Sequence, residues 1–291
     1  MAAITNTTLS TDLARALDQE VVENFDQSYN SLAEILGVVA PEPVAAGTAL
    51  YSRKITGTLD ATSYTEGDEV PVSKYVTSDT AIGAVTLTPR RRRTTAQAIQ
   101  KAGVEAAILR TDAKMTNDVR SAIFAGFVTA LAAGTTTATG TTLQAALANA
   151  DAALANAMET NSDGAPTDVI HLVNRLDAAS YLGTQPITTQ TVFGLTYLES
   201  FLGVERVILT NKVKSGTLYV VPSENLHVYA PDFGALAQAG LAYTTSDAGL
   251  IGVAHSAAYD HASVDTNIMS GLVIAPEFVD YIVKGTIAPA A

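Results

Sequence analysis

The chain has 291 residues and no cysteine, which excludes a disulfide framework, a thiolate nucleophile and a zinc site with sulfur ligands. Its formal net charge of -12 opposes binding to a phosphate backbone, which proteins hold mainly with Lys and Arg. Only 16% of the residues are charged, against about 25% in an ordinary soluble domain, so we expect wide neutral surfaces that contact other chains.

The amino-terminal residues are polar and rich in threonine. Residues 1–13 lack the basic start and the apolar stretch of a secretory signal, so they are typical of a cytoplasmic protein. No run approaches the roughly 20 apolar residues that cross a bilayer. We therefore expect no membrane span.

Residues 11–35 show the spacing of an amphipathic helix, with one apolar side and one acidic side. The apolar positions are Leu13, Leu17, Val21, Phe25, Leu32 and Ile35. Gly37 and the prolines at 41 and 43 end the helix and extend the backbone. The pattern predicts a helical arm that is separate from the rest of the chain.

The pattern changes to strand-like alternation over residues 49–87. Two strand-like runs, 51–59 and 70–87, surround a polar turn region at 62–68, which predicts a long hairpin. Because an isolated two-stranded hairpin is marginally stable in water, it must lie against something else. A neighbouring subunit is the natural support.

A second apolar stripe lies in residues 103–133, after the run Arg90 to Arg93. It consists of Ile108, Met115, Val119, Ile123, Phe127 and Leu131, at spacings of four or seven. Thr111 and Asp112 could cap an internal restart, so we expect either one long helix or two nearly collinear pieces.

After a Thr/Gly linker at 134–142, helices and strands alternate as in a compact α/β module. Thr142 is the expected N-cap of a helix that ends near Asn161. A strand at 169–173 and helices at 174–183 and 197–202 come next, and then strands at 205–210, 217–221 and 226–229. Residues 250–284 return to strand-like sequence, including 270–274 and 278–283.

Four stretches and their order resemble the HK97-type major capsid proteins of tailed double-stranded DNA bacteriophages. They are EGDEVPVSKY (66–75), TDAKMTNDVRSAI (111–123), VERVILTNKVKSGTLYVVPSENLHVY (204–229) and APEFVDYIVK (275–284). The resemblance implies an α+β fold with an N-terminal arm and an extended hairpin called the E-loop. It also implies a P-domain with a long spine helix and an inserted α/β A-domain. The corresponding residues are 1–46 (arm), 47–93 (E-loop), 94–139 and 250–291 (P-domain) and 140–249 (A-domain).

The resemblance also implies a function. Such a chain is a structural protein and not an enzyme, and it needs no cofactor. It assembles into pentamers and hexamers of an icosahedral virion shell that encloses DNA, after assembly in the host cytoplasm. The arm and the E-loop would be the main straps between subunits, and the expected E-loop contacts are Tyr64, Glu66, Asp68 and Lys74.

The resemblance implies further partners. Many relatives carry a scaffold region ahead of the arm, and this chain has no room for one, so we expect a separate scaffolding protein. A portal and a possible decoration protein are the other expected partners. Contact with packaged DNA would be non-specific.

The run Arg90, Arg91, Arg92 and Arg93 allows two interpretations. One is contact with nucleic acid, and the other is ion pairing with acidic groups of the arm or of a neighbouring chain, at the hinge of the hairpin. We favour ion pairs between subunits, because four arginines in an acidic chain find carboxylates nearby.

Other possible sites are weaker. His255 and His261 with Asp260 and Asp265 suggest a metal site, but a strand does not turn them all to one side. Some members of the resembled family join an E-loop lysine to an asparagine of the next subunit by an isopeptide bond. Such a bond from Lys54 or Lys74 to Asn267 is disfavoured, because nothing aligns these residues. Residues 159–170 imitate a calcium loop but end in Ile170, where a glutamate is needed.

Two alternative functions stay open. The first keeps the fold and is the shell of an encapsulin-type nanocompartment, which genome neighbours would distinguish from a phage. The second is an α/β enzyme without a recognisable motif, although the sequence has no Gly-rich phosphate loop and no GxSxG. Particle size separates an enzyme from a shell.

Overall fold

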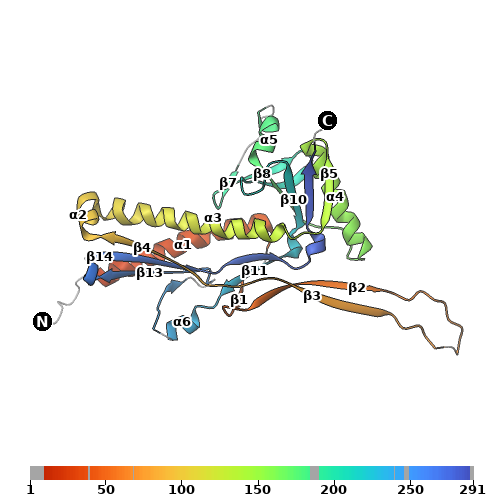
Figure 1. The fold of residues 1–291 in the computed structure, drawn as a ribbon, viewed down its shortest axis with the longest axis horizontal. Coiled ribbons are helices and arrows are strands. Elements are labelled where there is room, and N and C mark those ends of the chain that lie inside the picture. The colour runs from red at the N-terminus through yellow and green to blue at the C-terminus, as the bar shows by residue number, and fades with distance from the viewer. Residues whose placement is uncertain are drawn as a thin grey trace.

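The structure, a computed structural model, describes residues 10–38, 40–67, 69–183, 190–238, 240–245 and 249–288. The molecule is elongated, as Figure 1 shows. The long helix α3 (Arg110–Leu131) lies over strands at one end, an α/β module rises at the other end, and a long hairpin extends beyond the body. No helix among the described residues is long and apolar enough to cross a bilayer.

The predicted arm helix is confirmed as α1 (Ser10–Leu36). Its buried side chains are Val22, Phe25, Tyr29, Leu32 and Leu36, whereas the predicted Val21 and Ile35 lie at the margin of the stripe and are half-buried. These side chains join the main core of the same chain together with Phe124 and Phe127 of α3. The apolar side of this helix is therefore covered by its own chain, and its expected contacts with other subunits stay a prediction.

The predicted spine helix is confirmed, but its break lies elsewhere. A short helix α2 (Ala96–Val104) and a π-helical turn η1 (Glu105–Leu109) precede α3. The helical path is interrupted at Gly103, whose φ of 80° costs little for glycine. Thr111 is not a cap, since its hydroxyl donates back to the Ala107 carbonyl at 2.9 Å.

Two small sheets lie beside α1 and α3. One has the order β12-β13-β14-β4, built from β12 (Thr244–Thr245), β13 (Ile251–Ala258), β14 (Ser263–Ser270) and β4 (Thr88–Thr95). The other has the order β1-β11-β15, from β1 (Glu42–Val44), β11 (Leu226–Pro231) and β15 (Val273–Pro276). The arginine run is thus part of strand β4. The prediction of a continuous strand at 270–274 is wrong, because the chain changes sheets between β14 and β15.

A seven-stranded sheet forms the α/β module, in the order β5-β16-β10-β6-β9-β8-β7. Its strands are β5 (Thr136–Gly140), β6 (Val169–Val173), β7 (Gln190–Val192), β8 (Leu195–Phe201), β9 (Val204–Leu209), β10 (Thr217–Pro222) and β16 (Val283–Ile287). Helix α4 (Leu143–Thr160) packs on this sheet through a second apolar core. Helix α5 (Arg175–Leu182) comes after β6.

Two predicted elements of this region were wrong. The expected helix at 197–202 is strand β8, which turns back into β9 through Leu202 and Gly203, both with positive φ. The expected strand at 278–283 is a 3-10 turn, η4 (Val279–Tyr281), and only then does β16 begin. Tight turns are decided by backbone conformation, which apolar spacing does not reveal.

The residues that form the seven-stranded sheet differ from the predicted module range, 140–249. Strands β5 and β16 lie outside that range and belong to the seven-stranded sheet, whereas β11 and β12 lie inside it and belong to the other two sheets. The remaining short elements are η2 (Ser223–Asn225), α6 (Gly234–Gln238) and η3 (Tyr259–His261). The chain thus passes from strand β4 of one small sheet into the seven-stranded sheet, continues through the two small sheets from β11 to β15, and ends in the seven-stranded sheet with β16.

The predicted hairpin is confirmed as β2 (Ala49–Thr58) and β3 (Lys74–Ala84). Within the described residues these strands pair with each other and with no other strand. A bulge between Leu50 and Tyr51 marks the base, where Leu50 packs with Val85 and Ala275. Beyond this base the ribbon leaves the body (Figure 1).

Candidate assembly surface and buried ionic cluster

Polar contacts fix the base of the hairpin to the body. The hydroxyl of Ser52 donates to the Glu277 carbonyl at 2.5 Å and accepts from the Val279 amide at 3.2 Å. The ammonium of Lys54 lies 2.6 Å from the carboxylate of Asp280. Burial raises the pKa of Asp280, but the hydrogen bonds from Lys54 and Thr135 and the charge of Lys54 together outweigh it, so this pKa is below its ordinary value. The direction of the ribbon is therefore set by its first residues.

Beyond its base the hairpin is uncovered. Of the described residues 53–67 and 69–81, those whose side chains can be assessed are exposed, with Pro71 and Ser73 half-buried. Among the described residues, eight of the twelve large apolar side chains that are exposed belong to this ribbon. They are Tyr51, Ile55, Leu59, Tyr64, Val70, Val72, Tyr75 and Val76. Such a concentration marks a surface that contacts another molecule.

The structure places Tyr64, Glu66 and Lys74, three of the four sequence-predicted E-loop residues, on this ribbon. Tyr64 has 59% of its side chain exposed and Glu66 is exposed near the tip. Lys74 begins β3 and is exposed opposite Thr58. Asp68 lies outside the described residues. Their contacts with a second subunit stay a prediction.

Three of the four arginines in β4 pair within their own chain. Arg91 and Arg93 both contact the carboxylate of Asp265, Arg93 at 2.8 Å. Hydrogen bonds from Arg93 and then Arg91 hold the pKa of Asp265 far below its ordinary value. Arg92 lies 2.6 Å from Asp112. For these three, the expected pairing between subunits is replaced by partners that the fold brings close.

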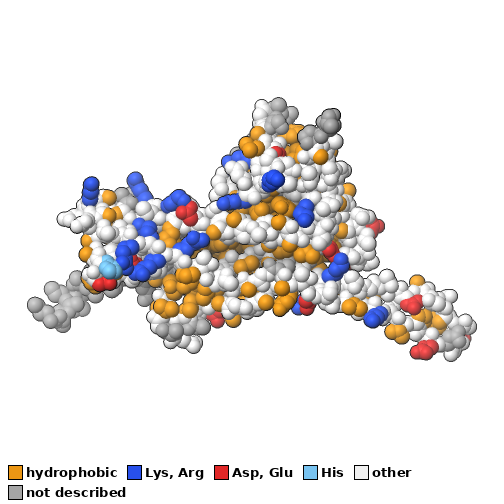
Figure 2. Space-filling model, viewed as in Figure 1, with side chains coloured by type: hydrophobic (Ala, Val, Ile, Leu, Met, Phe, Trp, Pro, Cys, Tyr) orange, Lys and Arg blue, Asp and Glu red, His pale blue; other side chains and the backbone are white. Residues whose placement is uncertain are grey.

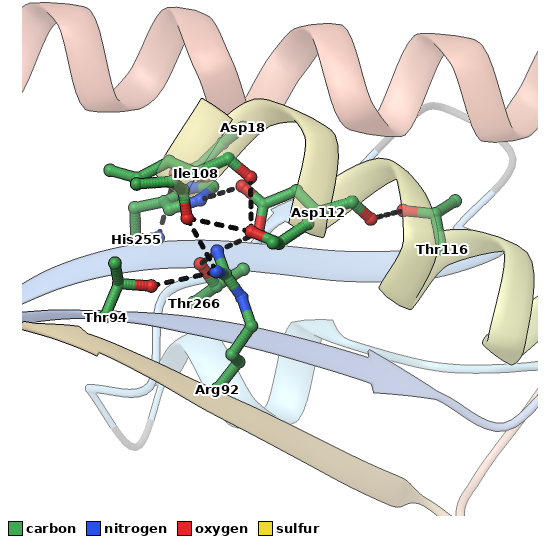
Figure 3. Close-up of polar contacts among 10 residues, drawn as sticks. Asp18, Arg92, Thr94, Ile108, Asp112, Thr116, His255 and Thr266 are labelled. Carbon is green, nitrogen blue, oxygen red and sulfur yellow. Dashed lines mark hydrogen bonds and ion pairs between the residues drawn. The ribbon is translucent and has the colours of Figure 1, made fainter. Parts of the chain in front are cut away.

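A buried ionic cluster joins α1, α3, β4 and β13 (Figure 3). Nδ1 of His255 contacts the carboxylate of Asp18, and its Nε2 lies 2.9 Å from Oδ2 of Asp112. The side chain of His255 is 3% exposed and that of Asp112 is 2% exposed. Because both ring nitrogens face carboxylate oxygens, each must donate, so the imidazole is protonated.

The electrostatics agree with that geometry. Burial lowers the pKa of His255, but hydrogen bonds to Asp112 and Asp18 and their charges outweigh it and raise the pKa to about 9. For Asp112, burial raises the pKa, and the hydrogen bonds and charges of His255 and Arg92 together lower it by more. Two positive and two negative groups thus balance around the buried His255 and Asp112, with Arg92 only partly covered.

Arg92 completes the cluster from β4. Its guanidinium also donates to the Ala107 carbonyl at 3.0 Å and to the Thr94 hydroxyl at 2.8 Å. The donors at its Nη2 reach Asp112 and the hydroxyl of Thr266. This side chain therefore fixes β4 against the start of α3.

Neither metal-like pattern in the sequence becomes a site among the described residues. His255 is used by the cluster, whereas His261 is on the surface beside Asp260 at 3.4 Å. In this part of the chain no group of three or more His, Asp or Glu side chains is arranged to hold a metal ion. Asn267, the disfavoured partner for an isopeptide bond, lies in β14 opposite Arg91.

Solved structures of phage capsids resemble this chain over most of its length. The mature capsid of bacteriophage PhiM1 matches with a TM-score of 0.53 at 11% identity, covering 86% of this chain and 85% of that chain. The capsid of cyanophage A-1(L) matches with a TM-score of 0.53 at 11% identity, covering 87% and 92%. The chain has the HK97-type capsid fold. The expected mixed α+β architecture is confirmed at this level.

The HK97-type likeness is one of fold and not of sequence. No protein-family model and no curated protein sequence matches the chain. The SrpI encapsulin of Synechococcus elongatus PCC 7942 also matches, with a TM-score of 0.49 at 11% identity, over 99% of this chain and 92% of that chain.

Proposed function

We propose that the chain is the major capsid protein of a tailed phage and that it assembles into pentamers and hexamers of an icosahedral shell around double-stranded DNA. The observation that carries this proposal is the uncovered, apolar hairpin. In the proposed correspondence, β2 and β3 are the E-loop, α1 is the arm, α3 is the spine helix and the seven-stranded module is the A-domain. Assembly, and not catalysis, is the activity.

The low stability of an isolated hairpin supports the proposed contact between subunits. Two strands alone are marginal in water, and this pair exposes side chains such as Val70 and Val72, at 59% and 81%. Burying a valine stabilises a complex by about 1.5 to 3 kcal/mol at most. Laying the ribbon across a second copy removes this apolar surface from water, and closed symmetry repeats the gain at every subunit.

The enclosed content separates a phage shell from an encapsulin-type compartment. The order of sequence stretches supports the phage, and the net charge of -12 suits a wall that does not grip packaged DNA. In this role the subunit is part of the virion, and its partners include a separate scaffolding protein and a portal. Nuclease-protected DNA in particles from infected cells is the expected content, and a cargo enzyme would instead favour the compartment.

The decisive measurement is particle mass. The full chain, produced alone and with the proteins encoded beside its gene, should give icosahedral particles of megadalton scale by ultracentrifugation and electron microscopy. A small oligomer under both conditions would overturn the proposal.

Deletion of residues 62–68 tests the ribbon separately. The shortened chain should keep the circular dichroism of the parent and lose assembly. If shells form normally without the tip, the ribbon is not the strap between subunits.

A further inference from the structure

A cationic depression lies at the end of the body far from the hairpin tip. It has a volume of about 650 Å³ and lies between β4 and the first turns of α3. Arg90 and Arg110 line it, are exposed, and have no ion-pair partner within the described part of the chain. Figure 2 shows Lys and Arg side chains gathered over this end of the molecule. In a chain with a net charge of -12, such a local excess of positive charge is distinctive.

The hairpin tip has the opposite charge. Between Lys54 and Lys74 the sequence contains four acidic residues and no basic residue. Of these, Glu66 and Glu69 are exposed and have no ion-pair partner within the described residues. Figure 2 shows acidic side chains on this end of the ribbon.

The apolar surfaces of the two ends also match. Met115 and Pro89 contribute apolar atoms to the depression. Val70 and Val72 lie beside the acidic residues of the tip and are among the most exposed apolar side chains described. A phosphate backbone would match the charge of the depression but not its apolar part.

Complementary surfaces at opposite ends of one molecule produce a head-to-tail contact. Such a contact is heterologous, because each copy uses its tip on one neighbour and its depression on another. The tip and the depression of one copy cannot contact each other, because they lie at opposite ends of the long axis (Figure 1). A contact of this kind joins copies into rings or chains.

We propose that the acidic hairpin tip of one copy docks in the cationic depression of a second copy, with Glu66 and Glu69 facing Arg90 and Arg110. This inference rests on the proposed shell function and names the partner surface of its hairpin. The exposed ion pairs give register and attraction between copies, and the valines add apolar contact.

A charge exchange tests the pairing. The double variant Arg90→Glu/Arg110→Glu should reduce the particle yield roughly tenfold or more, because like charges then face each other. The variant Glu66→Lys/Glu69→Lys should have the same defect. Combined in one chain, the four changes restore opposite charges and should recover assembly. Lys212→Glu/Lys214→Glu is the matched control for net charge, since both lysines are exposed on the module.

Each outcome is informative. Recovery in the fourfold variant supports the pairing, and its absence in chains that are folded by circular dichroism overturns it. Normal particles from Arg90→Glu/Arg110→Glu with an altered DNA content would assign the depression to nucleic acid and also overturn it. Failure of the unaltered chain to form particles would instead reject the shell function. The milder Arg90→Gln/Arg110→Gln variant should weaken assembly and its dependence on salt.

Discussion

The imidazole of His255 lies 2.9 Å from the carboxylate of Asp112, and this contact joins strand β13 to helix α3 inside the protein. The other ring nitrogen contacts Asp18 of α1. A single protonated side chain thus attaches the arm helix to the centre of its own subunit. The contact gives the stability of the fold a specific dependence on pH.

The first prediction concerns alkaline pH. The pKa of His255 is raised from 6.5 to about 9, so its protonated form stabilises the folded chain. This contribution is fully present below pH 6.5 and is lost as the pH rises through about 9, and it amounts to about 3 kcal/mol. Urea unfolding at a series of pH values should show this loss in the wild type and not in His255→Gln. If the unfolding free energies of the wild type and of His255→Gln changed in parallel with pH, the imidazole would not be charged in the cluster.

The second prediction concerns the shared carboxylate. Asp112→Ala leaves the buried charge of His255 and the half-buried charge of Arg92 without their common partner, which should cost about 3 to 5 kcal/mol of unfolding free energy. Asp118→Ala is the control on the same helix. Its partner Lys114 is exposed, so the loss should stay below about 1 kcal/mol. Equal losses in the two variants would contradict a special role for the cluster.

The third prediction tests whether α1 is docked on its own chain. Phe25 is fully buried, its ring packs edge-on against Phe193 at 5.9 Å, and the Arg120 guanidinium lies 5.6 Å from the ring centre. Phe25→Ala should lower the unfolding free energy by about 3 to 5 kcal/mol and speed proteolysis within α1. Gln19→Ala, on the exposed side of α1, should change it by less than about 0.5 kcal/mol. An unassembled Phe25→Ala subunit as stable as wild type would mean that the helix is not part of this core.

The sequence predicted the local elements well, because their signals are local. The hydroxyl of Thr142 accepts from the Ala145 amide at 3.2 Å, as a capping residue at the start of α4 should. The stripe of α3 also lies in the core. By contrast, β8 was misread as a helix because the positive φ of Leu202 is not visible in composition.

The ionic cluster was missed although its residues carried a signal. Asp112 is four residues after Ile108, in phase with the apolar stripe of α3, and Asp18 is four before the buried Val22. A carboxylate at a core position needs a cation or another donor. The sequence could indicate that need, but only the fold shows that one histidine meets both. The distance in sequence, 143 residues from Asp112 to His255, is what hid the pairing.

The last prediction concerns the apolar side chains of the hairpin, apart from its charge. Val72 is 81% exposed in the single chain, so Val72→Ser removes little packing within the subunit and should leave its unfolding free energy within about 0.5 kcal/mol. If the valine is buried between copies, the same change should raise the protein concentration at which particles first form, by up to roughly tenfold for about 1.4 kcal/mol. Leu176→Ser is the control, because Leu176 is 73% exposed but lies on the module. Assembly by light scattering should separate the two variants, whereas urea unfolding should not. If the Val72→Ser chain assembles like the wild type, Val72 is not buried between copies. The exposed apolar side chains of the ribbon would then have to contact a different partner.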